Sequence, residues 1–306
     1  MDADIEQASG GDPYLPVNQT LRRAIWLASY PKSGNTWLRI FLNNLMRELH
    51  NESDQPQNIN ALHEWSSREA GVKEYIDRMG KHPKDATAAE IAAVRPLAQE
   101  DLIRGSKGPV FLKTHNAVAN VEGHPTINFD ITCAAIYILR NPLDVVISYA
   151  NHMASTIDHM IEFMADDETC TQLTDQWRVY EFMSSWSFHV ASWISVPHRP
   201  VLILRYEDML KTPERSFGRV ASFLRFEPNS QQLQRAITNS SFDRLVEQEE
   251  KHGFREKPPE AETFFRSGKS GQWRDILSAQ QIQRIIRDHA PLMMRFGYLG
   301  ERYNLI

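Results

Sequence analysis

Short apolar runs alternate along this chain with segments whose apolar residues recur at helical spacing. The runs span residues 24–29, 110–113, 134–139 and 201–204, and the run at 134–139 is apolar throughout. Continuous apolar runs of this length are typical of strands buried on both faces of a parallel sheet. The pattern therefore predicts an α/β fold, in which a central, mostly parallel sheet is flanked by helices.

Helices are expected between these runs. After the first run, apolar side chains recur three, four and seven residues apart, at Trp37, Leu38, Phe41, Leu42, Leu45 and Leu49. Asn141 is a favourable N-cap and Pro142 suits the first position of the helix that follows it. Further helices are expected near residues 86–100 and 186–193, after Thr212–Pro213 and around residues 282–286. By contrast, residues 247–262 are charged and contain proline, which predicts a solvated or mobile loop.

The chain of 306 residues contains no internal repeat and no low-complexity linker. The simplest division is a flexible N-terminal tail at residues 1–20 and one domain at residues 21–306. The domain is long enough to bury a large core.

Charge and composition exclude several classes of protein. The net charge of −5 argues against a general nucleic-acid binder. Cys133 and Cys170 are the only cysteines, so a disulfide framework is excluded and free thiols are expected. The N-terminus lacks the features of a signal peptide, and no apolar stretch is long enough to cross a bilayer. We therefore expect a cytoplasmic protein that does not bind a membrane, and no side-chain cluster calls for a metal.

Polar side chains follow each of the apolar runs. Lys32, His115, Arg140 and Tyr206 come at or just after the carboxyl ends of four predicted strands. Ligands of open parallel sheets bind beyond these ends. The sequence therefore predicts that the four side chains meet at one edge of the sheet.

The turn after the first strand has the composition of an anion site. Lys32, Ser33, Gly34, Asn35 and Thr36 lead directly into a helix. The free N–H groups at a helix N-terminus attract anions, and glycine lets the backbone approach them closely. Lysine precedes Ser-Gly here, so the order differs from the Walker A pattern of ATPases. The turn thus suits phosphate or sulfate without being an ATPase P-loop.

The segment Tyr30-Pro31-Lys32-Ser33-Gly34-Asn35-Thr36-Trp37 resembles the 5′-phosphosulfate loop of sulfotransferases that use 3′-phosphoadenosine-5′-phosphosulfate (PAPS). Most members of that family have threonine where this chain has Asn35, and both side chains can form hydrogen bonds. The resemblance implies that Lys32 stabilises the leaving phosphate oxygen and that Trp37 helps to hold the adenine. It also implies that the loop is P-loop-like.

The segment Lys113-Thr114-His115 resembles the family motif whose histidine is the general base. An acceptor hydroxyl must lose its proton as it attacks sulfur, and a neutral imidazole titrates in a suitable range. The resemblance assigns this role to His115 and implies that Lys113 steadies the transferring group.

Four further segments, at residues 138–148, 204–209, 240–242 and 265–273, resemble binding motifs for the nucleotide part of PAPS. The first implies that Arg140 and Ser148 contact the 3′-phosphate, as suits the planar fork of arginine. The next two imply that Tyr206, Ser240 and Phe242 lie near the adenine. The last, residues 265–273, implies that Arg266 and Gly268 contact the 3′-phosphate. Ser267 stands where lysine is usual, so a side-chain charge is lost there, although its backbone N–H can still contact the phosphate.

These motifs run in the family's order from about residue 24 to residue 275. The chain is thus identified as a member of the cytosolic-type, PAPS-dependent sulfotransferase family. The long segment between the first loop and His115 indicates a bacterial-type member. The implied activity is transfer of a sulfuryl group from PAPS to a hydroxyl, or less readily an amine, of a small acceptor, by in-line displacement without a metal.

Two alternatives stay open at this point. One is a P-loop kinase that acts on a small hydroxyl compound with ATP and Mg²⁺. The other is a nucleotide-binding module without catalytic activity. The family's short dimer motif is not evident, which leaves both a monomer and a homodimer open.

The acceptor pocket is expected to be built by residues 50–105, 150–180 and 245–264. Their large apolar side chains predict an apolar or aromatic acceptor. The side chains are Trp65, Tyr75, Met153, Met160, Phe163, Met164 and Trp177.

Overall fold

The computed structural model describes residues 23–52, 55–171, 174–257, 262–300 and 304–305. The predicted tail at residues 1–20 lies outside these ranges.

The centre of the fold is a sheet of five parallel strands in the order β2-β3-β1-β6-β7. The strands are β1 (Ala24–Ser29), β2 (Ser67–Arg68), β3 (Val110–Thr114), β6 (Thr132–Leu139) and β7 (Val201–Arg205). All four predicted strands are confirmed within two residues at either end, and β2 is an addition at the edge beside β3. A small antiparallel pair, β4 (Asn120–Val121) and β5 (His124–Pro125), lies outside this sheet.

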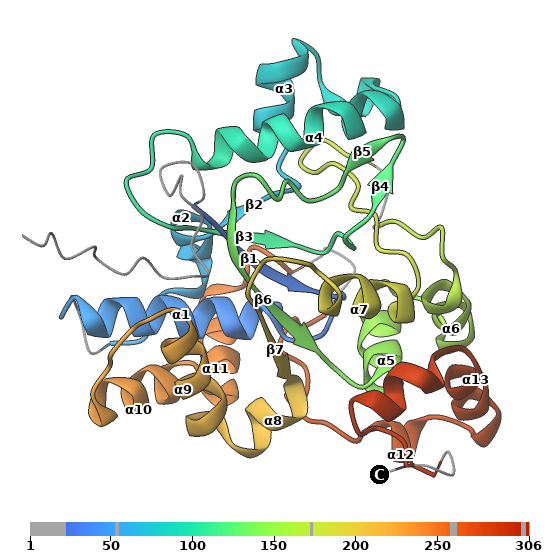
Figure 1. The fold of residues 1–306 in the computed structure, drawn as a ribbon. Coiled ribbons are helices and arrows are strands. Elements are labelled where there is room, and N and C mark those ends of the chain that lie inside the picture. The colour runs from blue at the N-terminus through green and yellow to red at the C-terminus, as the bar shows by residue number, and fades with distance from the viewer. Residues whose placement is uncertain (1–22, 53–54, 172–173, 258–261, 301–303, 306) are drawn as a thin grey trace, which may run out of the picture.

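Helices cover both faces of the sheet (Figure 1). On one face lie α1 (Asn35–Leu49), α9 (Pro213–Phe223) and α10 (Ser230–Asn239), and on the other lie α5 (Pro142–His152), α6 (Ile157–Ala165), α7 (Trp186–Ile194) and α13 (Ala279–Arg295). Leu27 on β1 packs in the core cluster beneath α1, whereas its neighbour Trp26 packs in the cluster beneath α5. Because successive residues of a strand face opposite helix layers, a strand buried on both faces must be apolar throughout.

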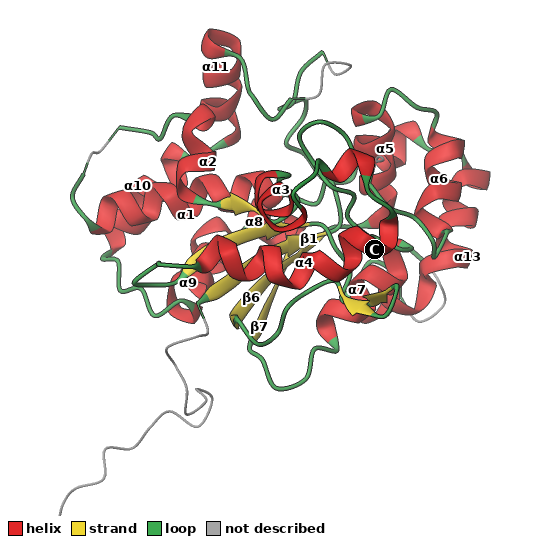
Figure 2. Ribbon diagram, turned by 90° about the horizontal axis from the view of Figure 1, so that it is seen from above, coloured by secondary structure: helices red, strands yellow, loops and turns green. Residues whose placement is uncertain are grey.

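The remaining elements surround this sandwich (Figures 1 and 2). They are the 3₁₀ turns η1 (Ile59–Ala61) and η2 (Pro83–Asp85), and the helices α2 (Leu62–Trp65), α3 (Lys73–Met79), α4 (Ala88–Ile103), α8 (Tyr206–Lys211), α11 (Phe242–His252) and α12 (Trp273–Ile276). In the parts of the chain that the structure describes, no helix is long and apolar enough to cross a membrane. Cys133 and Cys170 are free thiols.

Local sequence explains where the helices begin. The side chain of Asn141 accepts a hydrogen bond from the Leu143 N–H, and Pro142 occupies the first position of α5, as predicted. Thr87 and Glu90 form a reciprocal capping box at the start of α4. The central sheet and its helix layers thus follow from the hydrophobic pattern and from the caps.

One local prediction is wrong. Residues 247–252, expected in a loop, form the second half of α11. The charges that suggested a loop stabilise the helix, because Lys251 Nζ lies 2.7 Å from the Glu247 carboxylate one turn earlier. Glu249 accepts hydrogen bonds from the N–H groups of Phe264 and Phe265, so the chain beyond the helix folds back onto it.

Candidate active site

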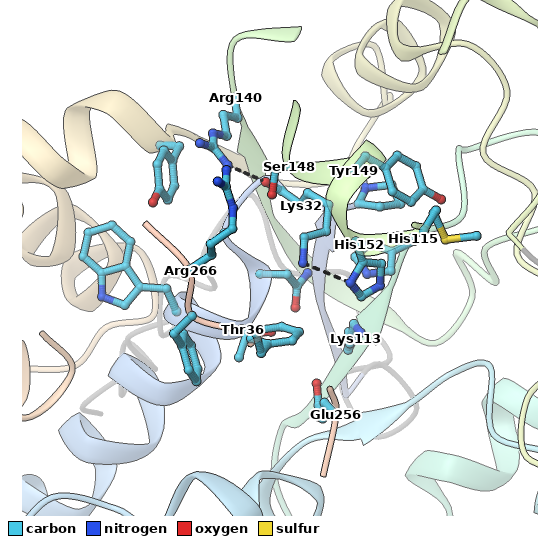
Figure 3. A pocket seen from close by; sticks show the side chains of 18 of the residues that line it. Lys32, Thr36, Lys113, His115, Arg140, Ser148, Tyr149, His152, Glu256 and Arg266 are labelled. Carbon is cyan, nitrogen blue, oxygen red and sulfur yellow. Dashed lines mark hydrogen bonds between the residues drawn. The ribbon is translucent and has the colours of Figure 1, made fainter. Parts of the chain in front are cut away.

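One cavity collects the polar residues at the carboxyl ends of four strands (Figure 3). Lys32 follows β1, His115 follows β3, Arg140 follows β6 and Tyr206 follows β7, and all four line it. Parallel strands bring their carboxyl ends to the same edge. The cavity therefore lies where this fold class binds ligands.

The turn after β1 is shaped to receive an anion. Gly34 is the N-cap of α1 with a left-handed backbone (φ 110°), and no side chain caps the first N–H groups of the helix. A Cβ at Gly34 would lie 2.8 Å from the Tyr206 ring. Asn35 donates from Nδ2 to the Leu27 carbonyl at 2.8 Å, which ties the turn to its strand. The uncapped N–H groups and the positive helix end can bind phosphate or sulfate oxygens.

Lys32 reaches into the cavity from this turn. Its ammonium donates to Nδ1 of His152 at 3.3 Å and lies 4.5 Å from the centre of the Phe264 ring. Burial, followed by the nearby charges of Arg140 and Arg266, lowers the pKa of Lys32 to about 8. His152 accepts this bond because burial and the Lys32 charge lower its own pKa to about 3. Lys32 is thus a cation held inside the cavity by a neutral imidazole.

His115 is locked in one tautomer. Its Nδ1 lies 2.7 Å from the Ser29 carbonyl oxygen. Since a carbonyl can only accept, Nδ1 carries the proton and Nε2 keeps its lone pair. Burial above all, and then the Lys113 charge, hold the pKa of His115 well below its usual range. Among the residues described, none donates a hydrogen bond to Nε2, so this nitrogen can accept a proton from a ligand.

The backbone of His115 is held as firmly as its ring. Its N–H donates to the Glu181 carboxylate, and its carbonyl accepts from Nε2 of buried His189 at 3.0 Å. Nδ1 of His189 in turn accepts from the Tyr137 hydroxyl at 2.9 Å. These bonds fix the imidazole of His115 relative to the sheet.

Lys113, two residues before His115, lies in a cationic part of the cavity. Burial above all, followed by the charge of Arg68, lowers the pKa of Lys113 to about 7. The carboxylate of Glu256 lies nearby (Figure 3) but is bound to Arg39 and Arg68, at 2.9 and 2.8 Å. Lys113 is therefore a lysine that can change charge near neutral pH.

Arg140 connects two segments that are distant in the sequence. Its Nη1 donates to the Lys32 carbonyl and its Nη2 to the Lys269 carbonyl, both at 3.0 Å. Its guanidinium lies 4.5 Å from the centre of the Tyr206 ring. The buried Nε has no partner in the described structure, so one donor of this cavity-lining residue is left unused. Arg140 thus joins the turn after β1 to the loop before α12.

The loop before α12 packs tightly on α11. Gly268 has a left-handed backbone (φ 61°), and a Cβ there would lie 2.3 Å from the Phe242 ring. Asp144 of α5 accepts hydrogen bonds from the N–H groups of Gly271 and Trp273 and anchors the end of the loop. Phe242, Arg266, Ser267 and Gly268 are thereby brought to one side of the cavity.

The structure brings most of the expected residues together, with two exceptions. The residues that line the cavity are Lys32, Gly34, Asn35, Thr36, Trp37, Lys113, His115, Arg140, Ser148, Tyr206, Phe242, Arg266, Ser267 and Gly268. The side chain of Ser33 is buried away from the cavity, and its Oγ has no partner. Ser240 is also buried, and its Oγ donates to the Ala236 carbonyl and accepts from Asn44. Neither side chain is among those that line the cavity.

The three segments expected to build the acceptor pocket all line the cavity, but most of the side chains singled out in them do not. Of the seven large apolar residues assigned to it, only Met153 lines the cavity. Tyr75, Met160 and Met164 are buried core residues. Trp65 stacks on Phe111, and Trp177 is 72% exposed. Large apolar side chains alone cannot separate a pocket wall from a core, because both need them.

Several lining residues were not anticipated from the sequence. They are Arg68, Tyr149, His152, Arg178, Glu181, Glu256, Phe264, Phe265 and Gln272. Most of them lie in the segments assigned to the acceptor pocket or in the motif at residues 265–273, but no signal singled them out individually; Tyr149 and Glu181 lie outside these segments. His152 is the exception, since it follows Ser148 by four residues and must share its face of α5.

The chain is similar over most of its length to known sulfotransferases. Residues 22–297 match the family model of the sulfotransferase domain. Flavonol 3-sulfotransferase of Flaveria bidentis is 25% identical over 85% of this chain and 78% of its own. Luciferin sulfotransferase of Photinus pyralis is 25% identical over 90% of this chain and 75% of its own.

Solved structures show the same fold. The crystal structure of retinol dehydratase in complex with retinol and PAP matches with a TM-score of 0.62 and 20% identity, over 89% of this chain and 82% of that one. The parallel sheet and its flanking helices are therefore those of a known fold.

Proposed function

Because this chain belongs to the sulfotransferase family, we propose that it transfers a sulfuryl group from PAPS to a hydroxyl of a small acceptor, with His115 as the base. One observation carries the assignment of the base. The imidazole of His115 donates through Nδ1 to Ser29, which leaves Nε2 as a base in the same cavity as Lys32 and the uncapped helix α1. Neither a kinase nor a module that only binds nucleotides has comparable support.

Several residues suit the nucleotide of PAPS. The turn at residues 32–36 can hold the 5′-phosphosulfate, and Arg140, Ser148, Arg266 and the backbone of residues 267–268 can hold the 3′-phosphate. Trp37, Tyr206 and Phe242 can enclose the adenine. The unpartnered Nε of Arg140 and Nε1 of Trp37 are buried donors that such a ligand can satisfy. Retinol dehydratase, a protein of the same fold, was solved with PAP, 3′-phosphoadenosine-5′-phosphate.

In the proposed reaction, PAPS supplies the sulfuryl group and its sulfur–oxygen bond to phosphate breaks. The acceptor oxygen forms the new bond to sulfur, and its proton goes to Nε2 of His115. The electron pair of the broken bond stays on the phosphate, where the Lys32 ammonium can stabilise the growing charge. Lys113 and the N–H groups of residues 33–36 can steady the moving group. The products are a sulfated acceptor and PAP.

Nucleotide binding tests the donor directly. Calorimetry should show that PAP binds in the absence of metal and binds much more tightly than ATP, because a cationic site is assigned to its 3′-phosphate. PAPS with a panel of phenols and alcohols should then yield PAP. Binding of ATP only with Mg²⁺, without preference for a 3′-phosphate, would instead support the kinase.

Arg140→Ala should weaken PAP binding by at least tenfold, because one charge-assisted contact contributes about 1.5–3 kcal/mol. Calorimetry with PAP and with 5′-AMP measures the effect. A loss that is larger for PAP than for 5′-AMP assigns Arg140 to the 3′-phosphate. Equal losses would mean that Arg140 only holds its loops together. Arg287→Ala, an exposed arginine of α13, is the matched control and should leave both affinities unchanged.

Gly268→Ala should also weaken PAP binding, by tenfold or more. The added Cβ would meet the Phe242 ring at 2.3 Å and must push the loop off α11, in addition to the backbone strain. Gly80→Ala is the control, because Gly80 has nearly the same φ (66°) but no atom within 4 Å of an added Cβ. Both variants should lose stability in denaturant unfolding, but only Gly268→Ala should lose affinity. Unchanged PAP affinity of Gly268→Ala would remove the loop from the donor site.

A further inference from the structure

The cavity wall on the His115 side carries both apolar and charged side chains. Tyr149, Met153 and Val179 supply apolar surface. Arg68 and Arg178 line the same cavity and, unlike Lys113, have no role in the proposed transfer. A wall built only for an apolar acceptor would not need two arginines, because burying them beside an apolar ligand costs free energy.

The two arginines come from adjacent stretches of backbone. Gly71 and Arg178 form an antiparallel bridge, and the Gly71 N–H donates to the Arg68 carbonyl at 3.3 Å. The Val179 N–H donates to the Ala70 carbonyl at 2.9 Å. These bonds place Arg68 and Arg178 on neighbouring parts of one wall, although they are more than a hundred residues apart in the sequence.

The carboxylates on this side are already used within the protein. Glu256 accepts from Nη1 of Arg39 through both oxygens at 2.9 Å and pairs with Arg68 at 2.8 Å. Glu181 accepts from the backbone N–H of His115. Glu256 is therefore engaged by two arginines, and one oxygen of Glu181 is held by the backbone.

The guanidinium of Arg178 is different. Its nearest carboxylate oxygen, on Asp175, lies 3.6 Å away, which is too far for a hydrogen bond. Among the residues described, none accepts a hydrogen bond from this guanidinium. Its side chain is 47% exposed, so it can move to meet a ligand. Arg178 thus lines the cavity with a guanidinium that forms a long ion pair with Asp175 and no hydrogen bond within the described structure.

The charges on this side carry a positive excess when Lys113 is protonated. Three arginines (Arg39, Arg68 and Arg178) face three carboxylates (Asp175, Glu181 and Glu256), and Lys113, with a pKa of about 7, adds a further positive charge when it is protonated. The positive charges also lower the pKa values of nearby titratable groups. Besides burial, Arg68 lowers the pKa of both His115 and Lys113, and Arg178 lowers that of His152. A negative charge on the ligand would therefore be stabilised here.

We propose that the acceptor carries a carboxylate in addition to its hydroxyl, and that Arg178, assisted by Arg68, binds this carboxylate. The hydroxyl is placed at His115 and the apolar body of the acceptor lies against Tyr149, Met153 and Val179. The planar fork of arginine suits a carboxylate because it donates two hydrogen bonds together. This inference names the acceptor class and rests on the sulfotransferase activity proposed above.

Three compounds that differ only in the charge at one end provide the test. They are 3-(4-hydroxyphenyl)propionate (anionic), 4-propylphenol (neutral) and tyramine (cationic). Their affinities for the protein saturated with PAP, and their kcat/KM values with PAPS, should be highest for the propionate. In Arg178→Gln, the ratio of propionate to propylphenol should fall about 10-fold to 100-fold in both measurements, since one charge-assisted contact is lost.

Charge reversal sharpens the test. Arg178→Glu should favour tyramine over the propionate, which loss of folding or general damage cannot produce. Arg68→Gln should lower the same propionate ratio, by less than Arg178→Gln. Arg287→Gln, remote from the cavity, is the matched control and should leave the ratio unchanged. Preference of the unmodified protein for propylphenol or tyramine would overturn the inference, as would an unchanged ratio in Arg178→Gln.

The outcome is separable from that of the proposed function. If PAP does not bind and none of the compounds is sulfated, the sulfotransferase assignment of the site fails. The affinities of the protein alone for the three compounds still report whether Arg178 selects a carboxylate. Transfer to propylphenol without preference for the propionate would uphold the activity and reject the anionic acceptor.

Discussion

Replacing His115 with alanine should lower kcat by about 10²-fold to 10⁴-fold, which is the usual contribution of a general base. The affinity for PAP should stay nearly unchanged, because no contact with the nucleotide is assigned to His115. The loss of kcat is expected because the tautomer of His115 is fixed. Nδ1 donates to the Ser29 carbonyl at 2.7 Å, so only Nε2 can take the proton of the acceptor. Initial rates with PAPS and calorimetry with PAP provide the two measurements.

His115→Asn separates the base from its structural role. An asparagine amide can still donate to the Ser29 carbonyl, but it has no basic nitrogen. It should therefore lose as much activity as alanine. His159→Ala, a change at an exposed histidine of α6, should have no effect. A loss of less than tenfold in both His115 variants would exclude His115 as the base.

The pH dependence of His115 has a definite sign. Burial and the Lys113 charge lower its pKa well below 6.5, so the imidazole is already neutral at pH 7. Its contribution to kcat/KM should stay constant down to pH 6.5 and fall only in more acidic solution, where the imidazole gains a proton. A fall in kcat/KM centred at or above pH 6.5 would contradict the lowered pKa of His115.

Replacing Lys32 with methionine should lower kcat by about 10²-fold to 10³-fold, comparable to the removal of one donor that stabilises transition-state charge. Methionine keeps much of the length and apolar contact of the side chain but removes the charge that can stabilise the leaving oxygen. Single-turnover rates with bound PAPS measure the chemical step directly. A change confined to the affinity for PAPS would make Lys32 a binding residue only.

Lys32 determines the expected dependence of kcat/KM on pH in alkaline solution. The pKa of Lys32 is lowered to about 8 by burial and by Arg140, so its positive charge is lost as the pH rises through 8. If the charge is needed, kcat/KM, which reports on the free enzyme, should fall above about pH 8. Lys32→Arg keeps its charge in this range and should lack that part of the decline. An identical decline in Lys32→Arg would assign it to another group.

Sequence alone determined the framework of this protein. Strands β1, β3, β6 and β7 could be read from their apolar runs, because burial on both faces of a parallel sheet demands them. The start of α5 could be read from Asn141 and Pro142, because caps are local interactions. Since parallel strands end at a common edge, the convergence of Lys32, His115, Arg140 and Tyr206 also followed from the order of elements.

Only the tertiary structure decided which other side chains reach that edge. Ser240 turned inward to Ala236 and Asn44, although its short motif suggested a contact with the ligand. Arg178 lies beside the segment that follows Arg68 because Gly71 and Arg178 form a backbone bridge between distant parts of the chain, which the hydrophobic periodicity does not predict. A strand or a cap depends on neighbours within a few residues, whereas a cavity wall depends on how separate segments pack. Sequence could therefore indicate the sulfotransferase family, while the presence of Arg68 and Arg178 on the cavity wall became apparent only in the folded chain.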